Sequence, residues 1–446
     1  MIHLDLPFLL QCAKFLLAFI PLCLIPVVIF IERKGASLIQ DRFGPNRANI
    51  PLLGGIRLFG FVQNLPDGIK LFSKESFIPK GAHKVWYLLA PMIPMTIALV
   101  TPSVIPWFAP LMVDGASGLV QVSGQILDAD AGILVLFALS GLSVYGVVLG
   151  AWASNSKYAL LGGMRASAQM ISYEVSMGLS VAGIFLLAGS FSLTRIVEWQ
   201  GANPLHWGIV LQPVGFVLFL VAMFAETGRP PFDMAEGESE IVAGYLMEYS
   251  GMRFALYYMG EYAHIAIASA LVSTLFLGGY HVPFLGTEAL RENLGQVAAG
   301  VLAVFAVLAA LIALAVRRWQ RIYATRGASD IAARKREHGI LFGLFSLAAV
   351  ALLGAAAAAI GLIHPARTLV AGVPGWPLWV ELGAAALQLG VLVAKTLCIC
   401  WVFVWVRWTL PRFRYDQVMY LGWKVLLNIA LLNLLATAVV AKLVKG

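Results

Sequence analysis

The sequence predicts an all-α polytopic membrane protein, and three observations support this fold class. Hydrophobic residues make up 60% of the 446-residue chain and charged residues 12%, whereas soluble globular proteins carry about 25% charged residues. Uncharged runs long enough to cross a bilayer separate the charged residues. Lys and Arg concentrate in alternate connections between those runs. This composition excludes a soluble enzyme, a disordered chain and a secreted disulfide scaffold.

The apolar runs define the predicted membrane spans. A helix needs about 20 apolar residues to cross the hydrocarbon core. Ten runs meet or approach this length: 15–31, 85–113, 131–156, 175–194, 199–225, 262–287, 293–316, 338–366, 382–406 and 425–441. The first and last are extended by apolar neighbours, and 382–406 is interrupted only by Lys395. We therefore predict about ten transmembrane helices.

The basic residues predict the orientation of these helices. With the N-terminus outside, the cytoplasmic connections (32–84, 154–166, 226–256, 317–337 and 407–424) hold 24 of the 31 Lys and Arg residues. The outer connections hold 5, and Lys14 and Lys395 lie within spans. The positive-inside rule then places both termini outside, on the periplasmic side of a bacterial inner membrane. The insertion of the helices into the membrane with basic residues on one side also explains the formal charge of +8. A nucleic-acid partner is therefore not needed to account for this charge.

The first cytoplasmic connection contains a predicted interfacial helix. Residues 52–75 alternate apolar side chains with Arg57, Asp67, Lys70 and Lys74. This pattern is typical of an amphipathic helix lying on the membrane surface, with a break expected near Pro66.

Two of the spans differ from the others. The region between Gly286 and Arg367 is rich in Ala, Leu and Gly, has no acidic residue within either span and joins them by a basic loop. We expect this hairpin to face lipid or to pack against another protein.

Ionisable residues within the membrane are candidate functional residues. Glu174 and Glu261 can carry function or form structural ion pairs, whereas His264 is more typical of a hydrogen-bonded packing residue. Lys395 is too deep to extend to the interface, so we expect it to have a carboxylate partner. Lys14 can reach the outer interface or form a pair.

The acidic connection at 226–248 contradicts the positive-inside tendency. It holds six of the chain's 23 acidic residues, and Arg229 is its only base. Glu236 and Glu240 would repel each other on one helical face. Crowded carboxylates titrate as a unit and can hold a proton near neutral pH. The alternative is a solvated loop that docks a basic partner. The proton-holding cluster and the docking loop are compatible interpretations.

Other chemistry leaves no signature in the chain. The sequence lacks the dinucleotide-binding glycine motif, the phosphate-binding loop, the paired-histidine zinc motif and the C-x-x-C spacing. Cys398 and Cys400 lie two apart on an expected helix and point in different directions. We therefore expect no metal, nucleotide, flavin or iron–sulfur cluster on this chain alone.

The cytoplasmic segments resemble one family, the membrane subunit at the quinone site of respiratory complex I (the subunit 1 family of NADH-quinone oxidoreductase). The matching segments are 32–34, 40–46, 67–75, 152–160, 172–175, 225–233, 236–240, 248–249, 261–262, 395–396, 405–407 and 411–417. The resemblance covers about 1–283 and 385–440, with its motifs in order and on the predicted side.

The resemblance implies a core of eight spans, so two spans are additional here. It divides the chain into a core with the interfacial helix and the acidic loop (1–283), an inserted transmembrane hairpin (287–366), and the last two core helices (367–446). Because two spans were added, the helices that follow keep their orientation.

The resemblance also implies site residues. The quinone chamber and its loops would contain Arg33, Arg42, Asp67, Arg229, Asp233, Glu236, Glu238 and Glu240. Proton coupling would involve Glu174, Glu226, Glu248, Glu261 and Lys395.

The implied activity is quinone reduction by NADH coupled to proton translocation, with this chain as one subunit of the translocase. Quinone would be the substrate, ubiquinone or menaquinone, while FMN and iron–sulfur clusters would belong to partner subunits. Partners would include the peripheral-arm, small and antiporter-like membrane subunits. Two alternatives remain, the equivalent subunit of an energy-converting hydrogenase and a stand-alone secondary transporter.

Overall fold

The all-α fold class is confirmed by the structure. The computed structural model describes residues 6–42, 44–50, 57–115, 118–235, 237–325, 331–363, 365, 368–370 and 373–445. It is 77% helical, and two short strand pairs are the only sheets in these ranges.

The helices differ widely in length. In chain order they are α1 (Leu6–Ala13), α2 (Ile20–Ile39), α3 (Asn64–Ser73), α4 (Lys84–Leu89), α5 (Met92–Val100), α6 (Gly132–Ala153), α7 (Lys157–Ala188), α8 (Leu193–Gln200), α9 (Gly208–Leu211), α10 (Pro213–Glu226), α11 (Glu238–Ile241), α12 (Gly251–Phe276), α13 (Thr287–Glu292), α14 (Leu294–Thr325), α15 (Ile331–Leu362), α16 (Leu378–Thr409), α17 (Tyr415–Tyr420) and α18 (Leu427–Lys445).

Shorter elements connect them. Short 3₁₀ segments are η1 (Lys14–Phe19), η3 (Leu58–Gln63), η4 (Thr101–Val104), η5 (Pro204–His206) and η6 (Gly244–Leu246), and η7 (Leu421–Leu426) is a π-helical segment between α17 and α18. The antiparallel strand pairs are β1 (Leu111–Gly115) with β2 (Gly118–Val122) and β3 (Thr368–Val370) with β4 (Val373–Gly375).

Nine of the predicted spans are confirmed as long apolar helical segments within the described ranges. They are Leu6–Ile39, Lys84–Val104, Gly132–Ala153, Lys157–Ala188, Gly251–Phe276, Leu294–Arg321, His338–Gly361, Leu378–Thr409 and Tyr415–Leu443. The tenth, predicted at 199–225, is broken: after α8 the chain forms η5 and α9, and only the 14-residue α10 continues inward. Pro204 and Pro213 each lack the backbone N–H that a continuous helix needs in its interior.

The second span is shorter than the run 85–113 predicted. Helical structure ends at Val104, and the chain turns into β1 at Leu111. Pro106 and Pro110 lie between these points and prevent the helix from continuing. The apolar character persists because this outer segment is packed inside the protein, where Ile105 and Trp107 are fully buried.

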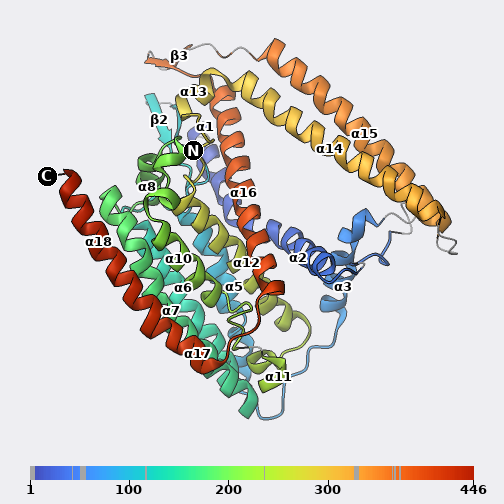
Figure 1. Ribbon diagram of the computed structural model, residues 1–446, viewed down its shortest axis with the longest axis vertical. Coiled ribbons are helices and arrows are strands. Elements are labelled where there is room, and N and C mark those ends of the chain that lie inside the picture. Colours follow the sequence, from blue (N-terminus) through green and yellow to red (C-terminus); the bar gives the residue numbers. More distant parts are fainter. Residues whose placement is uncertain are drawn as a thin grey trace, which may run out of the picture.

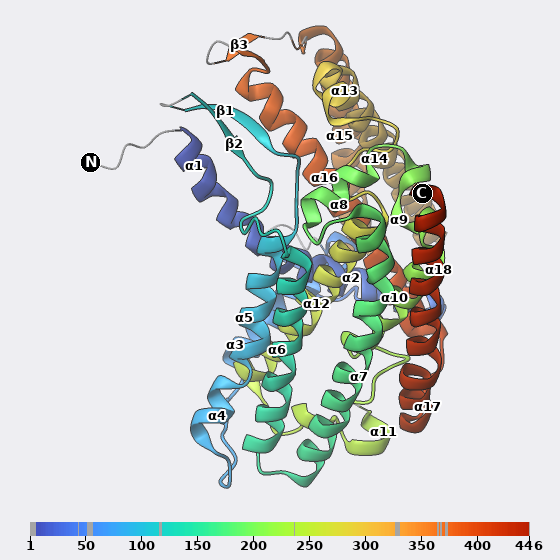
Figure 2. The same cartoon turned by 90° about the vertical axis from the view of Figure 1, so that its left-hand side faces the viewer.

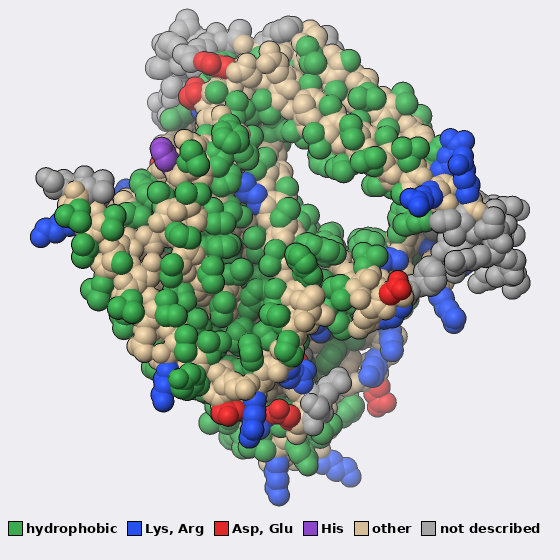
Figure 3. All heavy atoms as spheres, viewed as in Figure 1, with side chains coloured by type: hydrophobic (Ala, Val, Ile, Leu, Met, Phe, Trp, Pro, Cys, Tyr) green, Lys and Arg blue, Asp and Glu red, His purple; other side chains and the backbone are tan. Residues whose placement is uncertain are grey.

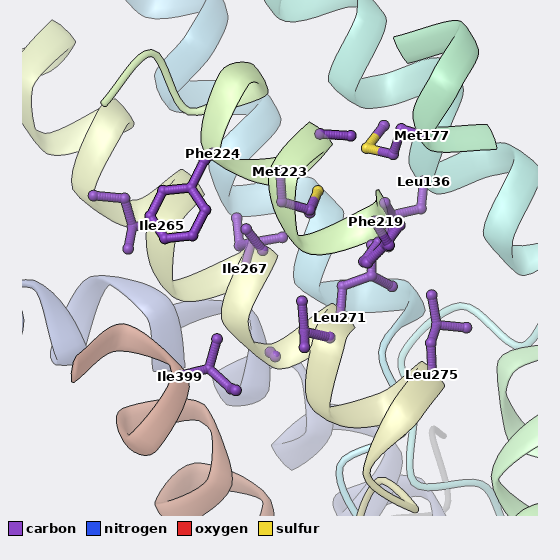
Figure 4. Packing of buried hydrophobic residues seen from close by; sticks show 14 of the residues in the cluster. Leu136, Met177, Phe219, Met223, Phe224, Ile265, Ile267, Leu271, Leu275 and Ile399 are labelled. Atoms are coloured by element: carbon purple, nitrogen blue, oxygen red, sulfur yellow. The ribbon is translucent and has the colours of Figure 1, made fainter. Parts of the chain in front are cut away.

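The long helix α12 lies at the centre of the helical bundle. It contacts α2, α5, α10 and α16 (Figure 1). Figure 4 shows Ile267, Leu271 and Leu275 of α12 packed among side chains of its neighbours. Small residues such as Ala263 and Ala270 are buried along its length, which lets neighbouring helices approach closely. The helix is therefore a fixed support for the polar side chains it carries.

The interfacial helix is confirmed as α3, but the break expected near Pro66 is wrong. Pro66 lies in the first turn of α3, where helices tolerate proline. The chain instead kinks at Phe59 and Gly60, both with positive φ. A Cβ atom on Gly60 would lie 2.0 Å from the Pro45 carbonyl oxygen, so only glycine fits there. Residues 51–56, at the start of the predicted helix, lie outside the described residues.

Helices α14 and α15 pack mainly against each other, as the two views in Figures 1 and 2 show. Near the start of α14 the pair is attached through a cluster that includes Leu290, Leu294 and Trp376. Near the opposite end, the Phe59 ring contacts Trp319 and Phe345, at ring-centroid distances of 5.8 and 6.2 Å. Figure 3 shows an opening between these two attachments. The division of the chain into a core and an inserted hairpin stays a prediction.

Candidate functional site

The first connection holds an ion pair between a transmembrane helix and the interfacial helix. Arg33, on α2, pairs with Asp67 in the first turn of α3. Gln63 Nε2 donates to the other carboxylate oxygen of Asp67 at 3.0 Å, and Asn64 Nδ2 donates to the Pro26 carbonyl at 2.9 Å. These contacts hold the start of α3 against α2. Arg42, in contrast, is exposed, and its Nε donates to Gln40 Oε1 at 2.6 Å.

A second polar group joins three membrane helices. Glu32, on α2, forms an ion pair with Arg407 of α16, and its other oxygen accepts a hydrogen bond from the Tyr262 hydroxyl of α12 at 2.7 Å. The Tyr258 and Tyr262 hydroxyl oxygens are 3.0 Å apart. Both carboxylate oxygens of Glu32 are therefore occupied.

The third group lies next to the second. Arg229, from the acidic connection, pairs with Glu261 of α12 at 3.2 Å. The Tyr245 hydroxyl donates to the other Glu261 oxygen at 2.7 Å, and the Arg229 guanidinium lies 4.5 Å from the centre of the Tyr262 ring. Arg229 thus connects the Glu32 group to the Glu261 group.

Two acids of the acidic connection, Asp233 and Glu240, form ion pairs. Asp233 pairs with Arg412, which precedes α17, and Glu240 pairs with Arg165 of α7, each at 2.6 Å. Helix α7 begins at Lys157, so its first turns extend beyond the predicted span and bring Arg165 to this connection. Glu236 and the side chain of Glu238 lie outside the described residues, so their predicted crowding stays a prediction.

Beside Glu261 and Tyr245 the protein opens into a cleft between helices. About 680 Å³ of space not filled by atoms lies beside α5, α6, α7 and α12. The polar residues around it are Ser143, Gln169, Glu226, Thr227, Tyr245, Tyr257, Glu261 and His264. A second cavity, with about 390 Å³ of unfilled space when the part open to solvent is included, is lined by Thr101, Ser140, Glu226, Thr227, His264 and apolar side chains. Three residues, Glu226, Thr227 and His264, line both spaces.

Two further predicted site residues, Glu174 and Glu248, are not part of either lining. Glu174, on α7, lies against α6, because a Cβ atom on Gly141 would be 2.8 Å from its Oε1. It interacts electrostatically with Glu226. The backbone carbonyl of Glu248 accepts a hydrogen bond from the Tyr87 hydroxyl at 2.6 Å.

Stacked tyrosines support the end of the acidic connection. The Tyr87 and Tyr249 rings are nearly parallel with centroids 4.4 Å apart. Burial raises the pKa of Tyr249, so its hydroxyl stays protonated and donates to the Gly150 carbonyl at 3.2 Å. The backbone that carries Glu248 is thereby fixed against α6.

Lys395 lies apart from this region, and the expectation of a carboxylate partner is wrong. Its Nζ donates to the carbonyls of Leu277, Gly279 and His281 at 2.7, 2.9 and 2.8 Å, just past the end of α12. It also lies 4.4 Å from the centre of the Trp207 ring. Backbone carbonyls left free where a helix ends accept hydrogen bonds from a cation as readily as a carboxylate does.

Lys14, whose environment the sequence left open, also donates to protein atoms. Its Nζ is 3.1 Å from the Gln125 carbonyl oxygen and 3.4 Å from Ser123 Oγ.

Comparison with known proteins identifies the family. The sequence pattern described as NADH dehydrogenase matches residues 12–331 and 338–438. The chain belongs to this family. Its relatives include an NADH-quinone oxidoreductase subunit of Cytophaga hutchinsonii, 35% identical over 408 residues, with 92% of this chain and 89% of the relative covered. Subunit 8 of the Rhodothermus marinus enzyme is 37% identical (92% and 91% covered), and a subunit of the Geobacter metallireducens enzyme is 38% identical (95% and 93% covered).

Membership of the NADH dehydrogenase family confirms the resemblance inferred from the sequence motifs. Several residues that complete the site were nevertheless not singled out as site residues from the sequence: Glu32, Arg165, Tyr245, Tyr262, His264, Arg407 and Arg412. Glu32, Arg407 and Arg412 lie inside the matching motifs, which was an available signal. Arg165 carried no signal, because its role depends on α7 beginning at Lys157, well before the predicted span at 175–194. Among the described residues, no group of three or more His, Cys, Asp or Glu could hold a metal ion.

Proposed function

We propose that the chain is the membrane subunit at the quinone site of a proton-translocating NADH-quinone oxidoreductase, the respiratory complex I. The relatives named above carry that enzyme's name, and the chain covers about nine-tenths of each. The structure adds polar groups that run from the surface helix α3 to cavities between the transmembrane helices.

The quinone chamber forms where the first and third connections meet, beneath a peripheral arm supplied by partner subunits. Support comes from contacts between these connections: Ser250 Oγ donates to the Glu75 carbonyl at 3.2 Å, and Arg253 donates to the Phe77 carbonyl at 3.1 Å. The chamber residues in this proposal are Arg33, Arg42, Asp67, Arg229, Asp233, Glu236, Glu238 and Glu240.

Reduction of quinone consumes two electrons, delivered by an iron–sulfur cluster of a partner, and two protons. Negative charge on the headgroup attracts nearby arginines and competes with their carboxylate partners. Arg229 is suited to transmit this change, because its guanidinium contacts both Glu261 and the Tyr262 ring. Weakening the Arg229–Glu261 pair lets Glu261 take up a proton at the edge of the cleft.

The observation that carries the proposal is the continuity of these groups. Glu261, which pairs with Arg229, lines the same cleft as Glu226. In this proposal Glu174, Glu226, Glu248 and Glu261 pass protons toward the antiporter-like subunits. Lys395 also stays a predicted coupling residue, although its contacts describe a structural role equally well.

The cellular setting follows from the same assignment. The nine apolar helices of the described ranges and the family identity make this an integral membrane protein. We place it in the bacterial inner membrane with both termini outside. Its FMN- and iron–sulfur-containing partners dock on the cytoplasmic side, and residues 287–366 form an added hairpin outside the family core.

Copurification tests this function. Extracted in mild detergent, a tagged chain is expected to bring down subunits that contain FMN and iron–sulfur clusters, and the complex is expected to reduce quinone with NADH. Copurification of a nickel-containing subunit would favour the hydrogenase alternative. Ion transport by the purified chain alone would favour the transporter and contradict the proposal.

A further inference from the structure

The junction of the two cavities contains buried polar atoms without protein partners. Among the described residues, Glu226 Oε2, His264 Nε2 and Gln169 Oε1 have no hydrogen-bond partner. All three residues line the first cleft, and Glu226 and His264 also line the second cavity. An unsatisfied polar atom inside a membrane protein is costly, so a polar space beside three of them is suited to ordered water.

The orientation of Gln169 supports this arrangement. Its Nε2 donates to the carbonyls of Ala225 and Phe232, at 2.7 and 2.8 Å. The amide nitrogen is therefore committed to the backbone on either side of Glu226, and the amide oxygen is available only as an acceptor for water in the cleft.

His264 is the single imidazole among the described residues that line this junction. On α12 it lies one turn beyond Glu261, whose oxygens are taken by Arg229 and Tyr245. The apolar part of the second cavity includes Leu136, Met177 and Ile267, visible in Figure 4, and these side chains cannot carry a proton.

The titratable and charged groups around His264 come from several elements. They are Glu226 on α10, Glu261 and Tyr257 on α12, Tyr245 on η6, Arg229 in the acidic connection, and Glu174, which acts on Glu226 from α7. The residues that α5, η4 and α6 contribute to the two cavity linings, Pro94, Thr101, Leu136, Phe137, Ser140, Ser143 and Val147, are not ionisable. Tyr257 is already committed, because its hydroxyl donates to the Gly146 carbonyl at 2.9 Å.

We infer that His264 and Glu226 exchange a proton through ordered water at the junction of the two cavities. The step is balanced: an imidazolium at His264 releases its proton to water, the water passes a proton to the Glu226 carboxylate, and neutral imidazole and carboxylic acid result. A neutral imidazole offers one donor and one acceptor, so it can receive a proton from the Glu261 side and release it to the Glu226 side. The inference rests on the proposed function and adds a histidine to a path otherwise made of carboxylates.

The test uses the whole complex reconstituted in proteoliposomes. His264→Gln keeps hydrogen-bonding atoms but cannot become a cation, whereas a merely structural histidine would tolerate this change. We expect NADH-driven quinone reduction and proton uptake to fall about tenfold or more, with NADH oxidation by an artificial acceptor unchanged. His206→Gln, in the exposed turn η5, is the matched control and is expected to behave like the unmodified complex.

Infrared difference spectra provide a second readout that does not depend on turnover. With isotope-labelled histidine, quinone reduction is expected to produce a histidine protonation band in the unmodified complex and in His206→Gln, and no such band in His264→Gln. Full activity in His264→Gln, or a histidine band that persists in it, overturns the inference. Failure of the proposed function is distinguishable, because the unmodified complex would then lack NADH-quinone activity.

Discussion

Glu32 and Arg407 form an ion pair although 375 positions separate them in the chain. The pair joins α2, the first long helix, to the C-terminal end of α16. Tyr262 of α12 donates to the same carboxylate at 2.7 Å. Three helices that surround the proposed chamber therefore share one polar contact, whose side chains are only 12% and 26% exposed.

Removing the arginine of this contact is expected to destabilise the helix junction. Arg407→Ala leaves the Glu32 carboxylate unpaired in a largely dehydrated place, which costs about 3 kcal/mol. We expect a lower melting temperature for the detergent-purified complex, measured by scanning fluorimetry. Arg414→Ala is the control, because the Arg414–Asp416 pair is exposed and contributes less than about 1 kcal/mol. Equal shifts in the two variants would contradict this role.

Neutralising Asp233 is expected to affect catalysis more than stability. Asp233→Asn keeps the shape of the side chain but weakens its 2.6 Å contact with Arg412 and changes the charge near the proposed chamber. The rate of NADH oxidation with quinone in isolated membranes should fall several-fold. This corresponds to a loss of about 1 kcal/mol or more of transition-state stabilisation. Oxidation with a soluble artificial acceptor should persist, because that reaction bypasses this subunit.

The control for Asp233 is an exposed acid elsewhere in the protein. Asp130 pairs with Arg195 at 3.2 Å, and both side chains are exposed. Asp130→Asn is expected to leave both activities unchanged. If Asp233→Asn also left both unchanged, its assignment to the quinone chamber would be withdrawn.

The sequence predicted the spans well because each span is decided by its own residues. Apolar length and the position of charges suffice for a helix such as α6, and the surface pattern of α3 is equally local. The break between α8 and α10 was missed, since hydropathy does not register Pro204 and Pro213 as interruptions. Similarly, the apolar run at 85–113 counted Ile105 and Trp107 as membrane residues, although they follow the helix and are buried inside the protein.

Pairings between distant residues were less predictable. Glu261 was recognised as an intramembrane acid, but its partner Arg229 reaches it only through the path of the connection between α10 and α12. Glu240 pairs with Arg165 because α7 begins at Lys157, well before the predicted span at 175–194. For Lys395, charge balance suggested a carboxylate, whereas the structure supplies the carbonyls of a helix end. Such partners depend on how elements pack, which the sequence alone does not specify.

Replacing Lys395 distinguishes a structural role from proton coupling. Lys395→Met removes three charge-assisted hydrogen bonds at the end of α12, where Gly278 and Gly279 turn the chain with positive φ. We expect the melting temperature of the complex to fall, consistent with a loss of about 3 kcal/mol or more. In the fraction that assembles, protons translocated per NADH should be unchanged. A lower proton ratio in assembled complex would instead support the coupling assignment.

Acid is expected to weaken the same region through His281. Burial, and then the positive charge of Lys395, lower the pKa of His281 to about 4. The unfolded residue has a pKa of about 6.5, so the stability from the neutral ring is complete above that value and is lost as pH falls toward 4. The melting temperature of the complex should decline as the pH is lowered from about 6.5 to about 4. His281→Phe should make this decline smaller. An unchanged pH dependence in this variant would rule out His281 as the source.

A buried ion group joins α13, which leads into the hairpin α14–α15, to α16. Arg291 pairs with Glu288 and with Glu381 of α16, both at 2.7 Å, and also donates to the Pro110 carbonyl at 3.2 Å. The Glu381 side chain is only 1% exposed, so Arg291→Ala leaves a carboxylate without its cation in the protein interior. Such a loss costs about 3–5 kcal/mol. We expect faster proteolysis near Arg318, in the last turns of α14, in the purified complex and a lower melting temperature.

Arg195→Ala is the matched control, because Arg195 lies on the same side of the predicted topology and its pair with Asp130 is exposed. It should change neither measurement, since exposed pairs contribute little. The double variant Arg291→Leu with Glu381→Leu tests the cause: it removes both charges and should recover much of the lost stability, as apolar replacements of buried ion pairs often do. If the double variant were as unstable as Arg291→Ala, then lost packing at Arg291 would explain the effect, and an unpaired Glu381 would not.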